Sequence, residues 1–297
     1  MCEMKPKICS EKLTSLAVAR NFAGVNSVVE AICGSIVESP LMLGEVDSVQ
    51  PFDRSLLGSI PQEAKLNFDQ KLGHLYEQAL ALLIDSSEQL DLVAKNLQVF
   101  DGAGRTIGEL DFVLQDISSG RHIHLELAIK FYLGVCGYDG WTFPGPDPKD
   151  NWLRKLDRMR THQWQLCQRP ETKALLHERF GIQAISTEHL ILGRIFYPHE
   201  VSEAPMPERV LESAGRGRWL RVRDFDQFLG HVTEVYLVDK PLWLVGSASR
   251  FSSLADTCSP ATVQALKERA AERCFMFHFP ESSGPWFLVP DSWPGIS

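Results

Sequence analysis

Hydrophobic and polar positions alternate with a period of two across the middle of the chain, from about residue 92 to residue 133. Turn sequences that contain glycine, at 101–104 and 118–120, interrupt this alternation twice. A period of two is typical of a β-strand, and short turns between such runs favour antiparallel pairing. The pattern therefore predicts a three-stranded antiparallel meander with strands at 97–100, 108–115 and 122–133.

Apolar residues recur at helical spacing on both sides of this meander. Pro61 and Glu63 suit the first turn of a helix that runs to about residue 84. Other helical segments are expected at 13–37, as one or two helices, and at 152–167, 172–180 and 261–273. Other strands are expected at 189–196, at 235–244 with an interruption at Pro241, and at 274–279 and 286–289. These elements predict an α/β protein with a mixed sheet, divided into an N-terminal helical segment (1–60), a core (61–200) and a C-terminal α+β extension (201–297) that packs on the core.

Composition limits the function classes. The chain has 297 residues, of which 44% are hydrophobic and 23% charged, so it can bury one large core or two smaller ones. The formal net charge of −8 argues against attraction of the whole surface to phosphate backbones, because such binding depends on Lys and Arg. We therefore expect any contact with DNA or RNA to be local.

The seven cysteines form no Cys-x-x-Cys pair, which argues against a zinc or dithiol redox site and favours a reducing compartment. No stretch approaches the roughly 20 apolar residues that a membrane-spanning helix needs, and the apolar residues after the N-terminal lysines are too interrupted for a signal region. We expect a cytoplasmic protein that does not contact a membrane.

The strand expected at 122–133 carries the residues of greatest chemical interest. Its odd-numbered positions are apolar, whereas the even-numbered ones include His122, His124, Glu126, Lys130 and Tyr132. Antiparallel pairing can bring Asp111 of the preceding strand beside Glu126. Adjacent carboxylates repel each other unless a cation lies between them, and their hard oxygens suit Mg²⁺ or Mn²⁺. Such an ion polarises a phosphoryl oxygen and activates water, while Lys130 stabilises the developing charge.

A second interpretation is purely structural. Antiparallel sheets often leave one face in water, so Asp111, Glu126 and Lys130 can equally be solvent-facing residues with a cross-strand ion pair. Exposed ion pairs of this kind contribute little to stability. The alternation alone leaves both interpretations open.

The order of these residues resembles the core of the restriction-endonuclease-like PD-(D/E)XK superfamily. The resemblance covers about residues 65–165, with Glu77 in a helix, Asp111 in a hairpin, then Glu126 and Lys130 on the next strand. It implies a restriction-endonuclease-like fold in which the three carboxylates bind Mg²⁺ and act in catalysis together with Lys130. Over most of its length the chain also resembles a bacterial family catalogued only as a domain of unknown function.

The spacing departs from the superfamily's Glu-x-Lys motif, because three residues separate Glu126 from Lys130, roughly 13 Å along an extended strand. Ala128 occupies the position that the motif would give to the glutamate. Positions 126, 128 and 130 still share one face, so a carboxylate shifted by one strand repeat is compatible with the site. Lys155 on the following helix is a candidate replacement lysine, and Gln163 resembles a glutamine that some of these nucleases use.

Other side chains are auxiliary candidates, each with a structural alternative. His124 can bind metal or shuttle a proton, although exposed strand histidines usually do neither. The segment 216–223 can hold phosphates and stack a base, or it can be a solvated strand with alternating arginines. Its candidate nucleic-acid contacts are Arg216, Arg218, Trp219, Arg221 and Arg223.

The resulting hypothesis is a nuclease that depends on Mg²⁺ or Mn²⁺ and acts on DNA or RNA. The alternative is a catalytically inactive protein of the same fold that binds nucleic acid or serves as a protein-interaction module, because a fold does not guarantee its chemistry. The two hypotheses differ in whether any nucleic acid is cleaved.

Overall fold

The computed structural model describes residues 22–229, 232, 234–245, 259–279 and 282–295. Its strands are β1 (Gln50–Pro51), β2 (Leu90–Phe100), β3 (Thr106–Asp116), β4 (His122–Leu133), β5 (Val135–Gly137), β6 (Gly140–Thr142), β7 (Ser186–Pro198), β8 (Gly215–Arg221), β9 (Glu234–Val238), β10 (Ser259–Thr262), β11 (Phe275–His278) and β12 (Trp286–Val289). Its helices are α1 (Phe22–Glu38), α2 (Leu72–Asp85), α3 (Trp152–Arg158), α4 (Pro170–Phe180), α5 (Phe225–Leu229) and α7 (Val263–Ala270).

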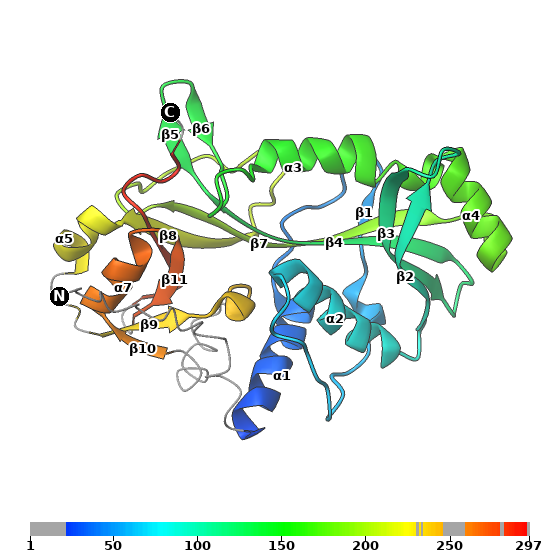
Figure 1. Ribbon diagram of the computed structural model, residues 1–297, viewed down its shortest axis with the longest axis horizontal. Helices are drawn as coiled ribbons and strands as arrows, with labels where there is room; N and C mark the ends of the chain where they lie inside the picture. Colours follow the sequence, from blue (N-terminus) through cyan, green and yellow to red (C-terminus); the bar gives the residue numbers. More distant parts are fainter. Residues whose placement is uncertain (1–21, 230–231, 233, 246–258, 280–281, 296–297) are drawn as a thin grey trace, which may run out of the picture.

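Within the described residues, ten of these strands form one mixed sheet. Its order is β10-β9-β11-β12-β8-β7-β4-β3-β2, with β1 also paired to β7, while β5 and β6 form a separate two-stranded ribbon. Figure 1 shows α3 on one face of the sheet and α1 and α2 on the other. The protein therefore has a mixed α/β architecture with a large sheet flanked by helices.

The predicted meander is confirmed, and both of its faces are covered. β2 pairs with β3 and β3 with β4 in antiparallel fashion, and β4 pairs in parallel with β7. On β4, Leu125 and Leu127 pack in the core formed with α1 and α2, whereas Ala128 and Tyr132 pack against Trp152 of α3. The polar face that alternation predicts is thus covered by a helix rather than wetted, as is usual for a strand with a parallel neighbour.

The helix predicted from residue 61 begins later, at Leu72. Residues 61–71 form turns: the amide of Ala64 donates to the carbonyl of Pro61 at 3.2 Å, and the amide of Asp69 donates to the side chain of Asn67 at 3.0 Å. A short polar side chain that bonds its own backbone competes with helical hydrogen bonding, which explains the late start. In the helix predicted at 13–37, α1 accounts for Phe22–Glu38, and residues 13–21 lie outside the described part.

The C-terminal strands continue the sheet of the core. β8 pairs in parallel with β7, and β12 pairs with β8. The expected hairpin of β11 and β12 is present, and α7 is shorter than the predicted 261–273. The strand expected at 235–244 ends at Val238, where a 3₁₀ turn (Lys240–Leu242) containing Pro241 follows. In the described part of the chain, no helix is long and apolar enough to cross a membrane.

Gly193 allows β7 to approach β4 closely. Its φ is 151°, and a Cβ added there would lie 1.6 Å from the carbonyl oxygen of Lys130 on β4. We expect Gly193→Ala to lower the free energy of unfolding by about 2 kcal/mol, because the strand must shift to relieve the overlap. Urea unfolding followed by circular dichroism measures this change.

Gly73→Ala is the matched control, since a Cβ there meets nothing within 4 Å and the position is in α2. It should be neutral or slightly stabilising because alanine favours helix. Equal free energies of unfolding for the two variants would show that a Cβ at position 193 does not destabilise the contact between β7 and β4.

Candidate active site

The candidate site lies where β3 separates from β4. Their ladder runs from Gln115 paired with His122 to Phe112 paired with Leu125, and the register ends there. Asp111 is the first residue of β3 past the end of the ladder. Its Oδ2 accepts a hydrogen bond from the backbone amide of Leu127 at 3.1 Å. The Asp111 side chain thus bonds the amide of Leu127, which lies beyond the end of the β3–β4 ladder. This contact holds the Asp111 carboxylate against β4.

Glu126 belongs to a chain of polar side chains that extends to α3. The amide of Gln163 donates to Oε1 of Glu126, and Nζ of Lys155 donates to the amide oxygen of Gln163 at 2.7 Å. Asn151 caps the start of α3, because its side chain accepts from the amide of Leu153 at 3.0 Å. The helix predicted at 152–167 changes to a π-helical turn at Met159–Gln163, and this turn presents Gln163 to the sheet.

Burial sets the protonation of the two carboxylates. Glu126 is only 2% exposed, and burial followed by repulsion from Asp111 raises its pKa to about 8. Burial raises the pKa of Asp111 to about 6; repulsion from Glu77 contributes to this rise, and the hydrogen bond from the amide of Leu127 opposes it. Burial lowers the pKa of Lys155, against the opposing effect of Glu126. The site therefore holds two acids whose negative charges are costly until a cation reaches them.

His124 lies beside Glu126 without a hydrogen bond to it. Its Nε2 is 3.8 Å from Oε2 of Glu126, and neither ring nitrogen has a hydrogen-bond partner among the described residues. Burial lowers the pKa of His124 to about 4, so the imidazole is neutral at pH 7 while Glu126 is largely protonated. The two are therefore not an ion pair, and the predicted exposed histidine is in fact fully buried.

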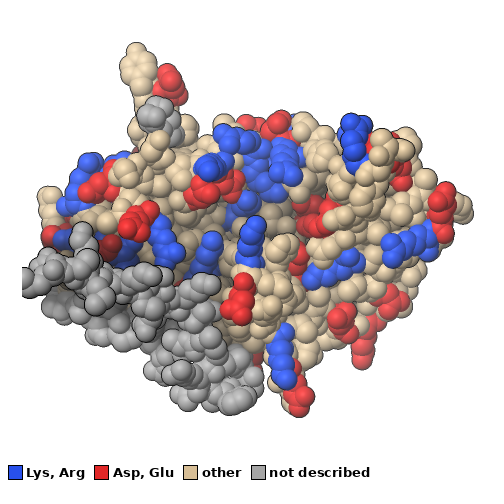
Figure 2. Space-filling model, in the orientation of Figure 1, with Lys and Arg blue, Asp and Glu red and all other residues tan. Residues whose placement is uncertain are grey.

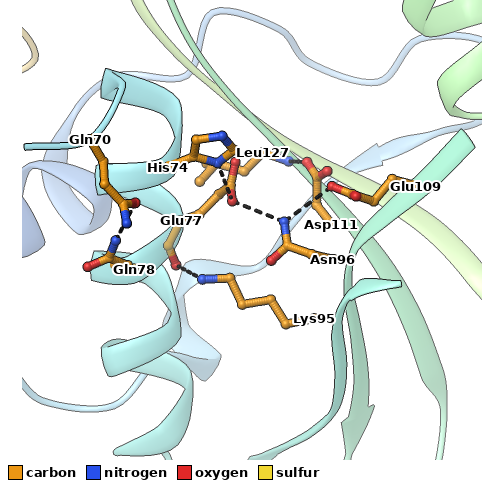
Figure 3. A network of polar contacts seen from close by, with 9 residues as sticks. All are labelled: Gln70, His74, Glu77, Gln78, Lys95, Asn96, Glu109, Asp111 and Leu127. Atoms are coloured by element: carbon orange, nitrogen blue, oxygen red, sulfur yellow. Dashed lines mark hydrogen bonds and ion pairs between the residues drawn. The ribbon is translucent and has the colours of Figure 1, made fainter. Parts of the chain in front are cut away.

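Glu77 reaches the same region from α2, as Figure 3 shows. Its Oε2 lies 3.2 Å from Nδ1 of His74 and accepts from the side-chain amide of Asn96 at 3.2 Å. The same amide donates to Glu109 at 3.2 Å. Asn96 has a φ of 50° within β2, a left-handed conformation that asparagine tolerates better than most residues. Asn96 was not among the predicted site residues, although an asparagine within a strand pattern indicates such a conformation.

Lys130 forms an ion pair with Asp150. Its Nζ lies 2.6 Å from Oδ2 of Asp150, and the hydroxyl of Tyr132 donates to the other oxygen of Asp150 at 3.3 Å. The structure therefore brings Asp111, Glu126, Lys155 and Gln163 together, with Glu77 nearby. Arg158, one helical turn after Lys155, also lowers the pKa of Glu126 and was not anticipated.

The segment 216–223 does not present a stacking platform. Trp219 is 4% exposed, and its indole donates to the carbonyl of Gly134 at 3.0 Å. The prediction that Trp219 stacks a base is therefore wrong, because its faces are packed in the core. The guanidinium of Arg216 pairs with Glu212 at 2.7 Å, and Arg221 donates to the carbonyl of Trp293 at 3.2 Å. Arg218 donates to the carbonyls of Pro198 and Val201, and Arg223 lies 3.8 Å from Asp224.

The residues fit a magnesium site with two protein carboxylates. Within the described residues, no group of three or more His, Cys, Asp or Glu side chains is arranged to hold a metal ion. Mg²⁺, however, commonly takes one or two carboxylates and completes its shell with water and substrate phosphate. Oε2 of Glu126 is buried and has no hydrogen-bond partner in the described part, which leaves an oxygen lone pair available beside Asp111.

Comparisons with known proteins identify a family without a described activity. Residues 41–286 match the family described as a domain of unknown function (DUF1853). No curated protein and no solved structure matches the chain.

Proposed function

The chain belongs to the family described as a domain of unknown function (DUF1853), and from its geometry we propose a nuclease that uses Mg²⁺ or Mn²⁺ to hydrolyse phosphodiester bonds of DNA or RNA. The observation that carries this proposal is the pair of the buried Glu126 and the half-buried Asp111. Burial, followed by repulsion from Asp111, raises the pKa of Glu126 to about 8. Perturbed carboxylates concentrate at functional sites, because a protein retains them only against an electrostatic cost.

The arrangement of elements supports a restriction-endonuclease-like core. The helix α2 precedes the meander of β2, β3 and β4, and α3 then leads to β7, which pairs in parallel with β4. This order resembles the PD-(D/E)XK core, in which a helix glutamate and two strand carboxylates surround the metal. Glu77 of α2, Asp111 of β3 and Glu126 of β4 are the carboxylates that we assign to these roles.

Asp111 and Glu126 would hold the metal, and a bound ion would supply Lewis-acid activation of the phosphate and of water. Asp111 is oriented by the amide of Leu127, so its free oxygen has a defined direction. Gln163 orients Glu126 by donating to Oε1 and leaves Oε2 free. Glu77 assists from α2, where Asn96 holds its carboxylate.

Lys155 is the lysine that we assign to stabilising negative charge on the phosphate. It lies within the hydrogen-bonded chain that ends on Glu126, and its pKa responds to both Glu126 and Asp111. Lys130 is 27% exposed in its side chain and is ion-paired with Asp150, so its charge is already neutralised locally. A catalytic role for Lys130 stays a prediction. The experiment below tests whether Lys130 or Lys155 stabilises the negative charge.

Local positive charge offsets the acidic surface near the site. Figure 2 shows Lys and Arg side chains gathered over the region where Figure 1 draws α3. Arg154 and Arg158 of α3 are exposed, and Arg158 makes no ion pair among the described residues. Such a patch can hold a substrate backbone locally although the whole chain carries a net charge of −8.

The test is cleavage of single-stranded, linear, supercoiled and branched DNA, and of RNA, with Mg²⁺, Mn²⁺ or EDTA. We expect metal-dependent cleavage, and we expect Lys155→Met to reduce the rate by about a hundredfold, because a charge-stabilising group is lost from the transition state.

Lys130→Met is the matched control and should reduce the rate by less than about threefold. The opposite order of effects would assign the lysine role to Lys130. Salt-sensitive binding of nucleic acid without cleavage of any substrate would refute the nuclease and support the inactive module.

A further inference from the structure

A cavity of about 750 Å³ lies apart from the candidate active site, where distant parts of the chain meet. Its walls come from α1, the segment 65–69 before α2, the segment 146–147, β9 with the turn after it, and α7 with the start of β11. Glu77, Asp111 and Glu126 do not line it. The volume is within the range of about 300–1,000 Å³ that is typical of small-molecule sites.

The floor of the cavity is apolar. Val28, Val238 and Leu242 line it and are almost fully buried. Trp243 lines the cavity with a ring that is 8% exposed and packs against Phe131 and Phe287. Its indole donates to the carbonyl of Val238 at 3.0 Å, and Nζ of Lys240 lies 5.6 Å from its ring centroid, so the ring and the cation are held next to each other. Such a floor suits a flat or apolar part of a ligand.

The rim carries cations that have no ion-pair partner in the described part of the chain. They are Lys65, Lys240, Arg269 and Arg273, all exposed. The guanidinium groups of Arg269 and Arg273 each lie 4.9 Å from the ring centroid of Phe275. Stacking on a ring leaves the N–H edges of a guanidinium free, and those edges match the oxygens of a phosphate.

Acceptor groups are interspersed with these cations. Asp69, Asp147 and Asp239 also line the cavity, together with Asn67. Four cations against three carboxylates leave little net charge, so the lining suits a ligand with one phosphate better than a polyphosphate. Carboxylates and amides can accept hydrogen bonds from ribose hydroxyls and base amino groups, whereas an acyl chain would leave them unpaired.

One wall is formed before any ligand arrives. The backbone amide of Asn67 donates to Oε1 of Gln78 at 3.2 Å, and Nε2 of Gln78 donates to Gln70 at 2.6 Å. Figure 3 shows the side chain of Gln70, which precedes α2, next to that of Gln78 within α2. The segment that carries Lys65 and Asn67 is therefore tied to a helix, which reduces the ordering cost of binding.

We propose that this cavity binds a nucleoside monophosphate, with the base on the apolar floor and the phosphate at Lys240 and Arg273. This proposal goes beyond the nuclease activity and does not depend on it. The cavity and the candidate active site share none of their principal residues, so either can fail alone.

The experiment is isothermal titration of the full chain, in EDTA, with the four ribonucleoside 5′-monophosphates, supported by quenching of tryptophan fluorescence. At least one nucleotide should saturate below about 1 mM. Lys240→Ala combined with Arg273→Ala should weaken that binding at least about tenfold, because charge-assisted hydrogen bonds to the phosphate are lost. The matching nucleoside and inorganic phosphate should each bind more weakly than the nucleotide.

Arg179→Ala is the matched control, since Arg179 also lies over an aromatic ring, that of Phe180 at 5.2 Å, but outside this cavity. It should leave binding unchanged, and thermal unfolding midpoints should show that all variants are folded. The proposal is overturned if no nucleotide binds up to about 10 mM, if the double substitution has no effect, or if dodecanoate binds there more tightly than the nucleotides.

Discussion

Glu126→Gln is expected to reduce metal-dependent cleavage by about a thousandfold or more, and Asp111→Asn by a similar factor. Glutamine has nearly the same size and shape as glutamate but carries no charge, so it can keep the contact with Gln163 while losing affinity for a divalent cation. Asparagine can likewise keep accepting from the amide of Leu127 through its carbonyl oxygen. Initial rates of DNA or RNA cleavage at saturating Mg²⁺ and Mn²⁺ measure both effects.

Glu188→Gln is the control for a general effect of removing a buried carboxylate. Glu188 is 6% exposed on the neighbouring strand β7, and its register partner is Leu125, so it belongs to the opposite face of the sheet from Glu126. Its Oε1 lies 2.5 Å from the guanidinium of Arg121. Glu188→Gln should retain cleavage within a few-fold. Wild-type rates in Glu126→Gln and Asp111→Asn would refute the assignment of the metal ligands.

The second large effect is on stability at alkaline pH, where Glu126→Gln should be more stable than the parent by on the order of 3 kcal/mol. Burial and repulsion from Asp111 raise the pKa of Glu126 from 4.5 to about 8 in the folded protein. The stabilising contribution of the protonated carboxyl is therefore complete below about pH 4.5 and is lost as the pH rises through 8. The variant has no such loss, so its free energy of unfolding should depend less on pH.

Urea unfolding of both proteins at several pH values between 5 and 9, in EDTA, tests this prediction. Burial lowers the pKa values of His124 and His189 to about 4, so both imidazoles stay neutral across this pH range and the difference between parent and variant reports on Glu126. Added Mg²⁺ at pH 9 should stabilise the parent and not the variant, because only the parent offers two carboxylates to the ion. Parallel stability curves from pH 5 to 9 would contradict a raised pKa at Glu126.

Sequence analysis anticipated the strands of the core well, because alternation is a local property of a chain. The strands β3, β4 and β7 and the hairpin of β11 and β12 lie close to their predicted positions, whereas β2 begins at Leu90, seven residues before the predicted start. Helix ends were less predictable. Pro61 suited a helix start, yet Asn67 bonds the backbone of Asp69 and delays the helix to Leu72. The spacing of apolar residues carries no information about hydrogen bonds between side chains and the backbone, so it does not predict where they delay a helix.

Tertiary structure decided what surrounds each predicted side chain. The sequence around Trp219 predicts a basic patch with an exposed aromatic ring. Parallel pairing of β8 with β7 and β12 instead places Trp219 in the core. The alternation of β4 likewise indicates a polar face without indicating what covers it. A helix packed on that face turned an apparently wet surface into a site where Glu126 is 2% exposed.

By itself, the sequence determined the α/β class, the strands of the meander and the placement of Asp111 and Glu126 on adjoining strands, because strand periodicity assigns each residue to a face. Only the tertiary structure decided that Lys155 and Gln163 join Glu126 while Lys130 pairs with Asp150. It also decided that the two carboxylates are buried enough to perturb each other. The physical reason is that protonation and ion pairing depend on distances and burial among segments far apart in the chain, which no local pattern encodes.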